Sequence, residues 1–81
     1  MDDLERLGIA GRTLIFFTSD NGGSFRAARG PLRSNGPLRG GKNTMYEGGL
    51  RVPLIAYWSG KIQPKVSDRI CYFGDILPTF A

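Results

Sequence analysis

The chain has 81 residues, a formal net charge of +4 at pH 7, no histidine and one cysteine. A chain of this length is one small domain at most, because it buries only about 60–65% of the surface that its unfolded form exposes. The composition excludes an internal disulfide and any Ser-His-Asp or Cys-His site within these residues, and no apolar stretch of about 18 residues predicts a membrane-spanning helix.

The sequence predicts two strands between two helical segments. Residues 2–7 predict a short helix, and residues 13–18 form an apolar, β-rich run without alternation, which is typical of a strand covered on both faces in a parallel sheet. Residues 52–58 predict a second buried strand, in which Pro53 is tolerated only near the start. Residues 75–81 predict the beginning of a second helix. This order indicates an α/β fold in which a long glycine-rich loop joins two buried strands.

The loop between the strands is large for a domain of this size. Residues 19–50 hold eight of the twelve glycines. A loop of that length without secondary structure is uncommon inside a compact domain. We therefore expect residues 1–81 to be part of a larger domain, truncated at both ends.

Two hard oxygen ligands follow the first strand directly, in the sequence Asp20-Asn21-Gly22. Carboxylate and amide oxygens suit calcium or magnesium, and ligands of α/β sheets bind beyond the carboxyl ends of the strands. Asn-Gly is also a favoured turn dipeptide, so a simple tight turn is the alternative reading of these residues.

A second segment brings one lysine, Lys42, back on a glycine-rich loop. Residues 36–42 satisfy the first seven positions of the phosphate-binding P-loop pattern, but Asn43 stands where that pattern needs Ser or Thr. A P-loop also follows its strand directly and opens a helix, which residues 36–53 do not allow, so we reject it. A cation site and a lysine at one place instead imply a substrate with negatively charged oxygens.

The loop is basic, which raises a different class of function. A small module that binds nucleic acid would use such a cluster, whereas the simpler reading is a set of solvated loop charges. The aromatic residues fall in the strand patterns and do not interleave with the arginines, which argues against a stacking platform for bases. The basic residues between Gly22 and Arg51 face one acidic residue, Glu47; they are Arg26, Arg29, Arg33, Arg39, Lys42 and Arg51.

Five segments in series resemble the type I sulfatases, of the arylsulfatase and N-acetylgalactosamine-6-sulfatase type. Each motif is weak alone, but their common order along nearly the whole chain is specific. They are Thr-Leu-Ile-Phe-Phe-Thr-Ser-Asp-Asn-Gly-Gly at 13–23, Asn-Gly-Pro-Leu-Arg-Gly-Gly-Lys at 35–42, Tyr-Glu-Gly-Gly-Leu-Arg-Val-Pro at 46–53, Tyr-Trp-Ser-Gly-Lys-Ile at 57–62 and Asp-Ile-Leu-Pro-Thr at 75–79.

The resemblance implies that residues 1–81 are the later part of the catalytic half of an alkaline-phosphatase-like α/β domain. It implies that Asp20 and Asn21 ligate an active-site Ca²⁺, which suits the family better than Mg²⁺. It also implies that Lys42 binds the sulfate of the substrate and acts as a catalytic residue, since a lysine steadies charge on the leaving oxygen. Glu47 and Arg51 match the family's Glu-Gly-Gly-x-Arg segment, and we expect them to support the lysine loop structurally.

One departure concerns the nucleophile. Sulfatases use a formylglycine made from the Cys or Ser of a Cys/Ser-x-Pro-x-Arg motif, and Cys71 has Phe73 and Asp75 where proline and arginine are required. We expect Cys71 to be a small buried side chain and the formylglycine to lie upstream of Met1 in a full-length enzyme. The isolated chain is therefore predicted to be inactive.

The resemblance implies the class of substrate and leaves open a related metalloenzyme as the alternative and the selectivity among sulfate esters. It implies an aryl or carbohydrate sulfate ester, no nucleic acid and an extracytoplasmic location, whether periplasmic, secreted or lysosomal. A phosphodiesterase or phosphatase-like metalloenzyme of the same superfamily is the nearer alternative, and the Gly-Gly-Lys and Glu-Gly-Gly-x-Arg segments favour a sulfatase over it. Selectivity among sulfate esters depends on pocket walls outside these motifs.

Overall fold

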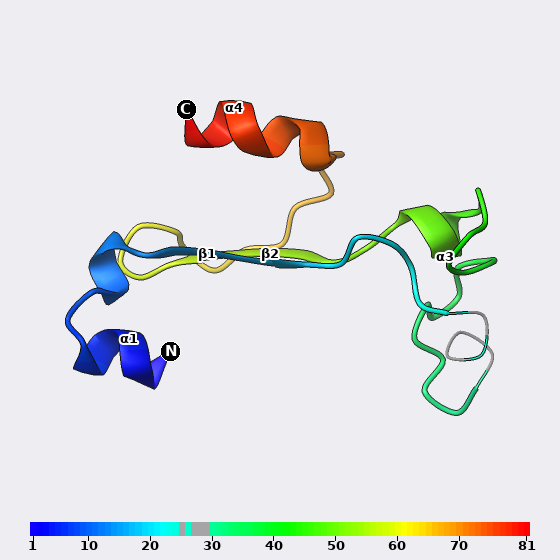
Figure 1. Ribbon diagram of the computed structural model, residues 1–81, viewed down its shortest axis with the longest axis horizontal. Helices are drawn as coiled ribbons and strands as arrows, with labels where there is room; N and C mark the ends of the chain where they lie inside the picture. The colour runs from blue at the N-terminus through cyan, green and yellow to red at the C-terminus, as the bar shows by residue number, and fades with distance from the viewer. Residues whose placement is uncertain (25, 27–29) are drawn as a thin grey trace.

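A computed structural model describes residues 1–24, 26 and 30–81. Figure 1 shows two strands side by side along the long axis of a molecule that measures 42 × 29 × 20 Å, with α1 at one end and α3 and the glycine-rich loop at the other. The elements are α1 (Asp2–Arg6), the 3-10 helix η1 (Ala10–Arg12), β1 (Leu14–Thr18), α3 (Glu47–Leu50), β2 (Leu54–Trp58), the 3-10 helix η2 (Phe73–Asp75) and α4 (Ile76–Phe80).

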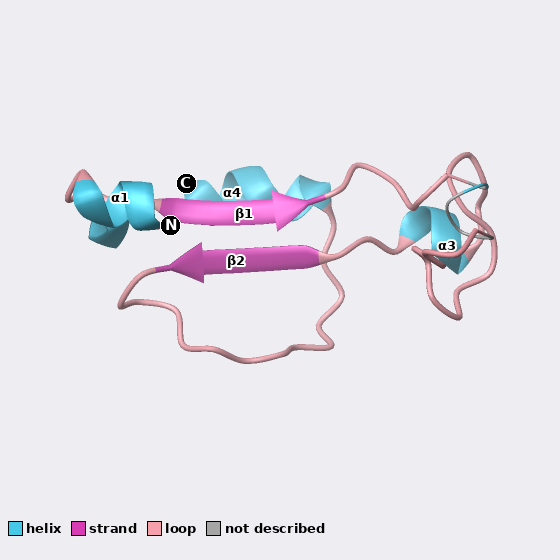
Figure 2. Ribbon diagram, turned by 90° about the horizontal axis from the view of Figure 1, so that it is seen from below, coloured by secondary structure: helices cyan, strands magenta, loops and turns pink. Residues whose placement is uncertain are grey.

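The two predicted strands are present and form a mixed α/β structure, but they are antiparallel. Leu14 pairs with Trp58 at one end and Thr18 pairs with Leu54 at the other, as the opposed arrows of Figure 2 show. The parallel arrangement inferred from the apolar run was therefore wrong. Among the described residues of the connection, no helix returns the chain to the start of β1; Thr18, where the chain leaves β1, pairs with Leu54, where it enters β2.

The prediction that both strands are buried was also wrong. No hydrophobic side chain is buried among residues 1–24, 26 and 30–81. In β2 only Trp58 is half-buried, while Phe17 of β1 is 64% exposed. The apolar pattern indicates which side chains need cover, whereas two strands and a few short helices offer too little surface to provide it.

One face of the strand pair is partly covered. Phe16 of β1 meets Phe80 of α4 edge to face, with ring centroids 5.3 Å apart and an interplanar angle of 70°. On the same face, the indole N–H of Trp58 donates to the carbonyl of Gly11 at 2.9 Å and ties β2 to η1. Aromatic pairs of this geometry add to the stability that burial gives, so α4 is docked by a specific contact although it is short.

The other face, which we call the open face, consists of Ile15, Phe17, Ile55 and Tyr57. The register places Ile15 opposite Tyr57 and Phe17 opposite Ile55, so the four side chains form two cross-strand pairs. Phe17, Ile55 and Tyr57 are all exposed. A continuous apolar face of this kind needs a further layer of structure above it.

The segment between β2 and η2 carries no helix or strand, and its residues 60–72 are exposed. Cys71 lies in it and is exposed, so its predicted burial was wrong. Nothing in the sequence around Cys71 specifies a packed element, and the small apolar character of a thiol is not enough to bury it. Within the part of the chain that the structure describes, no helix is long and apolar enough to cross a membrane.

Candidate functional site

The Asp20-Asn21 turn begins where β1 ends. The hydroxyl of Ser19 donates to the carbonyl of Asn21 at 2.8 Å, which folds the backbone sharply just beyond the strand. The Asn21 carboxamide in turn donates to a carboxylate oxygen of Asp20. Asp20 is exposed and Asn21 is half-buried. The turn therefore holds the two predicted metal ligands against each other at an accessible end of the strand.

The lysine loop is joined to this turn by backbone hydrogen bonds. The amide of Lys42 donates to the carbonyl of Gly23 at 2.8 Å, and the amide of Gly22 donates to the carbonyl of Gly49 at 2.9 Å. The side chain of Lys42 is exposed. Two motifs that are distant in sequence thus meet in space, with Lys42 next to the residues that follow Asn21.

Glycines make this approach possible. A Cβ atom built on Gly22 would lie 1.7 Å from the carbonyl oxygen of Gly48, and one on Gly48 would lie 2.4 Å from that of Gly40. Real Cβ atoms do not come so close to a carbonyl, so the backbones pack because the side chains are missing. Gly22, Gly41, Gly48 and Gly49 are the buried residues of this cluster.

The loop reverses immediately after Lys42. Asn43 has a φ of 69°, in the left-handed region that asparagine tolerates better than most residues. The hydroxyl of Thr44 donates to the carbonyl of Gly41 at 2.7 Å and accepts from the amide of Gly41 at 3.1 Å. Thr44 was missed by sequence reasoning, because its role depends on a fold of the loop that its spacing does not reveal.

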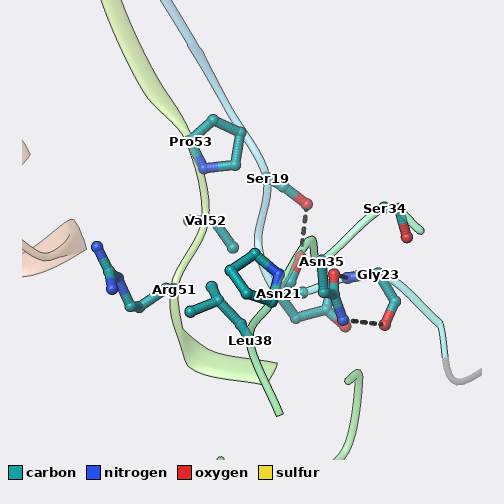
Figure 3. Close-up of a pocket in the computed structure, with 11 residues that line it drawn as sticks. Ser19, Asn21, Gly23, Ser34, Asn35, Leu38, Arg51, Val52 and Pro53 are labelled. Atoms are coloured by element: carbon teal, nitrogen blue, oxygen red, sulfur yellow. Dashed lines mark hydrogen bonds between the residues drawn. The ribbon is translucent and has the colours of Figure 1, made fainter. Parts of the chain in front are cut away.

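Asn35 was missed for the same reason. Its carboxamide oxygen accepts from the amide of Gly23 at 2.9 Å, and its nitrogen donates to the carbonyl of Gly40 at 3.0 Å. Figure 3 shows the carboxamide turned toward Gly23. The only signal in the sequence was that Asn35 precedes Gly-Pro, a pattern that predicts a turn.

Glu47 and Arg51 lie one turn apart at α3 and form an ion pair with 3.6 Å between Arg51 Nε and Glu47 Oε2. Both side chains are about two-thirds exposed, at 64% for Glu47 and 68% for Arg51. Exposed pairs contribute at most about 1 kcal/mol. The Arg39 guanidinium lies 3.9 Å from the centre of the Tyr46 ring, a cation–π contact within the same loop.

A cavity of about 510 Å³ opens beside the joined motifs. Figure 3 shows Asn21, Asn35 and Arg51 among the residues that line this cavity. Asp20 and Lys42 do not line it. The residues around it are Ser19, Asn21, Gly22, Gly23, Ser34, Asn35, Pro37, Leu38, Arg51, Val52 and Pro53.

The donor set fits part of a calcium site. Among the described residues, no group of three or more His, Cys, Asp or Glu side chains gathers in one place. Asp20 and Asn21 supply two hard oxygens, whereas calcium takes roughly 6–8. If the Asn21 carboxamide turned its oxygen toward Asp20, two oxygens would face each other, an arrangement that a cation between them stabilises. The pair suits a hard cation and needs further ligands.

Comparison with known proteins identifies the family. The sulfatase family model matches residues 1–81, so the chain belongs to the sulfatase family. The chain is 46% identical to bovine arylsulfatase A over 76 residues, and 52% identical to pig N-acetylgalactosamine-6-sulfatase over 77 residues. It is 38% identical over 79 residues to the uncharacterized sulfatase YdeN of Escherichia coli K12. No solved structure matches the chain.

The matched share differs greatly between the chain and its relatives. The alignments cover 93% of this chain with arylsulfatase A, 94% with the pig enzyme and 98% with YdeN. The chain spans only about 15% of the length of these relatives. The arylsulfatase and N-acetylgalactosamine-6-sulfatase resemblance is thereby confirmed, while the roles of Asp20, Asn21, Lys42, Glu47 and Arg51 stay predictions.

Proposed function

We propose that this chain supplies calcium ligands and a sulfate-binding lysine to a sulfatase that hydrolyses aryl or carbohydrate sulfate esters. Asp20 and Asn21 hold Ca²⁺, and Lys42 binds the sulfate and steadies the leaving oxygen. The formylglycine and the remaining calcium ligands come from another part of the catalytic domain. The full-length protein works outside the cytoplasm, as its family resemblance implies.

The observation that carries this proposal is the junction of the two motifs. Two backbone hydrogen bonds hold the turn and the lysine loop together, from Lys42 N to Gly23 O and from Gly22 N to Gly49 O, and no hydrophobic side chain of the described residues is buried there. The peptide groups of Gly22 and Gly48 lie directly against each other, so the two segments cannot come closer than they are. Electrostatic catalysis needs such a fixed spacing, since charges that are already in place need no reorganisation when the reaction begins.

Calcium, when bound, draws charge from the sulfate oxygens and so makes the sulfur easier to attack. The chain's own residues have separate tasks. Asp20 contributes the negative charge and Asn21 a neutral oxygen, while the exposed ammonium of Lys42 is available to an anion. Ser19 fixes the backbone around Asp20 through its hydrogen bond to the carbonyl of Asn21.

The basic loop fits this function better than nucleic-acid binding. Arg39 lies over Tyr46 and Arg51 pairs with Glu47, so two cations of the cluster are engaged within the loop. Arg29 lies outside the described residues. The partners of Arg39 and Arg51 hold these side chains to the protein, whereas binding of a phosphate backbone needs them free to reach outward.

The test uses bovine arylsulfatase A in which this chain replaces the matching segment, here called the grafted enzyme. We expect Lys42→Ala to lower kcat for an aryl sulfate roughly 100- to 1,000-fold, as loss of one charge-stabilising donor does. Lys65→Ala, in the exposed segment after β2, is the matched control and should leave kcat unchanged. Asp20→Ala should abolish the response of activity to added Ca²⁺.

Two results would overturn the proposal. One is equal activity of the Lys42→Ala and Lys65→Ala enzymes at equal folded concentration. The other is hydrolysis of an aryl phosphate in preference to the aryl sulfate, which would point to the phosphatase-like alternative. The unaltered 81-residue chain should show no sulfate ester hydrolysis above background with Ca²⁺ present, because positioning an anion does not replace the attacking group.

A further inference from the structure

The side chain of Asn35 connects the two halves of the proposed site. Its oxygen accepts from the amide of Gly23 at 2.9 Å, and its nitrogen makes a longer contact of 3.5 Å with the carbonyl of the same residue. The carboxamide therefore pairs with Gly23 much as a neighbouring peptide group would. The nitrogen also donates to the carbonyl of Gly40 at 3.0 Å. Both donor hydrogens and the acceptor of one side chain are used.

The partners of Asn35 stand next to the proposed functional residues. Gly23 is two positions after Asn21, and Gly40 is two positions before Lys42. One carboxamide thus spans the metal turn and the lysine loop. Asn35 is half-buried and lines the cavity, where water competes less for its hydrogen bonds than at an open surface.

The surroundings hold the carboxamide in place. A Cβ on Gly23 would lie 2.8 Å from the Asn35 oxygen and 2.5 Å from the Ser34 hydroxyl, so the turn approaches residues 34 and 35 closely. The backbone bond from Lys42 to Gly23 reaches the carbonyl that Asn35 also contacts. Asn35 and Lys42 therefore depend on the same peptide group.

We propose that Asn35 is a positioning residue that sets the distance between the metal turn of Asp20 and Asn21 and the sulfate-binding Lys42. This inference rests on the proposed function of those residues. The side-chain partners of Asn35 are backbone groups of Gly23 and Gly40, and the role needs no contact with metal or substrate. Its effect comes through the backbone, because a shift of Gly23 relative to Gly40 moves the cation site relative to the lysine.

Three substitutions in the grafted enzyme separate the parts of this role. Asn35→Ala removes every hydrogen bond of the carboxamide. Asn35→Asp keeps an acceptor for the Gly23 amide and loses the donor to Gly40. Gln63→Ala removes a carboxamide from the exposed segment after β2, outside the cavity lining, and leaves the Asn35 bridge intact, so it serves as the matched control.

We expect Asn35→Ala to lower kcat roughly 10- to 100-fold with a small change in KM, as a misplacement of about 1 Å at a reacting centre does. The Ca²⁺ concentration for half-maximal activity should rise as well. Asn35→Asp should fall between Asn35→Ala and the unaltered enzyme. A residue that only stabilises the fold would lower the amount of folded enzyme and would leave kcat per folded molecule and the Ca²⁺ response unchanged.

The outcomes distinguish this inference from the proposed function. If Lys42→Ala is inactive while Asn35→Ala matches Gln63→Ala, the function stands and the positioning role is overturned. If Lys42→Ala is fully active, the proposed function itself fails. If the Asn35→Ala enzyme folds too poorly to assay, Asn35→Asp decides: a kcat per folded molecule and a Ca²⁺ response equal to those of the unaltered grafted enzyme would overturn the proposal.

Discussion

Strands are usually buried and loops exposed, whereas in the described residues of this chain the glycine-rich loop is buried in part and the strand pair is not. The described residues of the segment 19–53 contain no strand, yet Gly22, Gly41, Gly48 and Gly49 are buried there. In β1 and β2, which have the composition of a core, no side chain is buried. Burial in the loop is backbone against backbone and is completed within the segment. Burial of the strands needs apolar partners that the described residues do not supply.

The contrast explains how so few residues hold two distant motifs together. Loops are normally variable surface segments, and their backbone groups bond to water. Here backbone groups of the loop bond to one another. The amide of Gly48 donates to the carbonyl of Arg39 at 2.7 Å, and the amides of Lys42 and Gly22 donate to the carbonyls of Gly23 and Gly49. The strands need only keep the two ends of the loop together, which the Thr18–Leu54 pair does.

A substitution that disrupts the glycine packing should have the largest effect, because it removes the burial that distinguishes the loop from the strands. Gly22→Ala places a Cβ 1.7 Å from the carbonyl oxygen of Gly48, so one backbone must move. We expect a loss of about 3 kcal/mol or more in loop stability, since overpacking against a backbone cannot relax through a rotamer change. The measurement is amide exchange of residues 19–53 in the grafted enzyme, where protection of Gly22 and Lys42 should disappear.

Gly11→Ala is the control for that prediction, because a Cβ on Gly11 would meet nothing within 4 Å. It should leave exchange in the loop unchanged. Equal protection at Gly22 and Lys42 in the Gly22→Ala and Gly11→Ala enzymes would show that the glycine contacts are dispensable.

The open face gives the second prediction. Phe17 is 64% exposed and Ile55 57%, so the 81-residue chain should self-associate through this face. Phe17→Glu should weaken self-association roughly 10-fold or more, since burial of such a side chain contributes about 1.5–3 kcal/mol. Sedimentation velocity over a concentration series measures this. Leu32→Glu, with the same charge change in the loop, should have little effect. A monomer with a cooperative thermal transition would contradict the prediction.

The sequence predicted the elements better than their surroundings. The predicted strands at 13–18 and 52–58 match β1 and β2 within two residues at each end, and residues 75–81 contain α4. The positions of these elements depend on local composition and on the Gly and Pro residues that bound them. Strand direction and burial failed, because both depend on what packs around Phe17 and Ile55. The sequence named Asp20, Asn21 and Lys42 as candidates, whereas Asn35 and Thr44 bond to backbone groups that only the folded loop brings near.

The smallest expected effect belongs to the Glu47–Arg51 pair. If glycine packing holds the loop, Glu47→Gln should lower the free energy of unfolding of the grafted enzyme by less than about 1 kcal/mol, as for other exposed ion pairs. Asp3→Asn breaks another exposed pair, Asp3–Arg6 at 2.8 Å, far from the loop, and should cost about the same. Thermal unfolding at low and high salt compares them. A Glu47→Gln loss several times larger than that of Asp3→Asn, accompanied by lower kcat, would mean that charge rather than glycine packing supports Lys42.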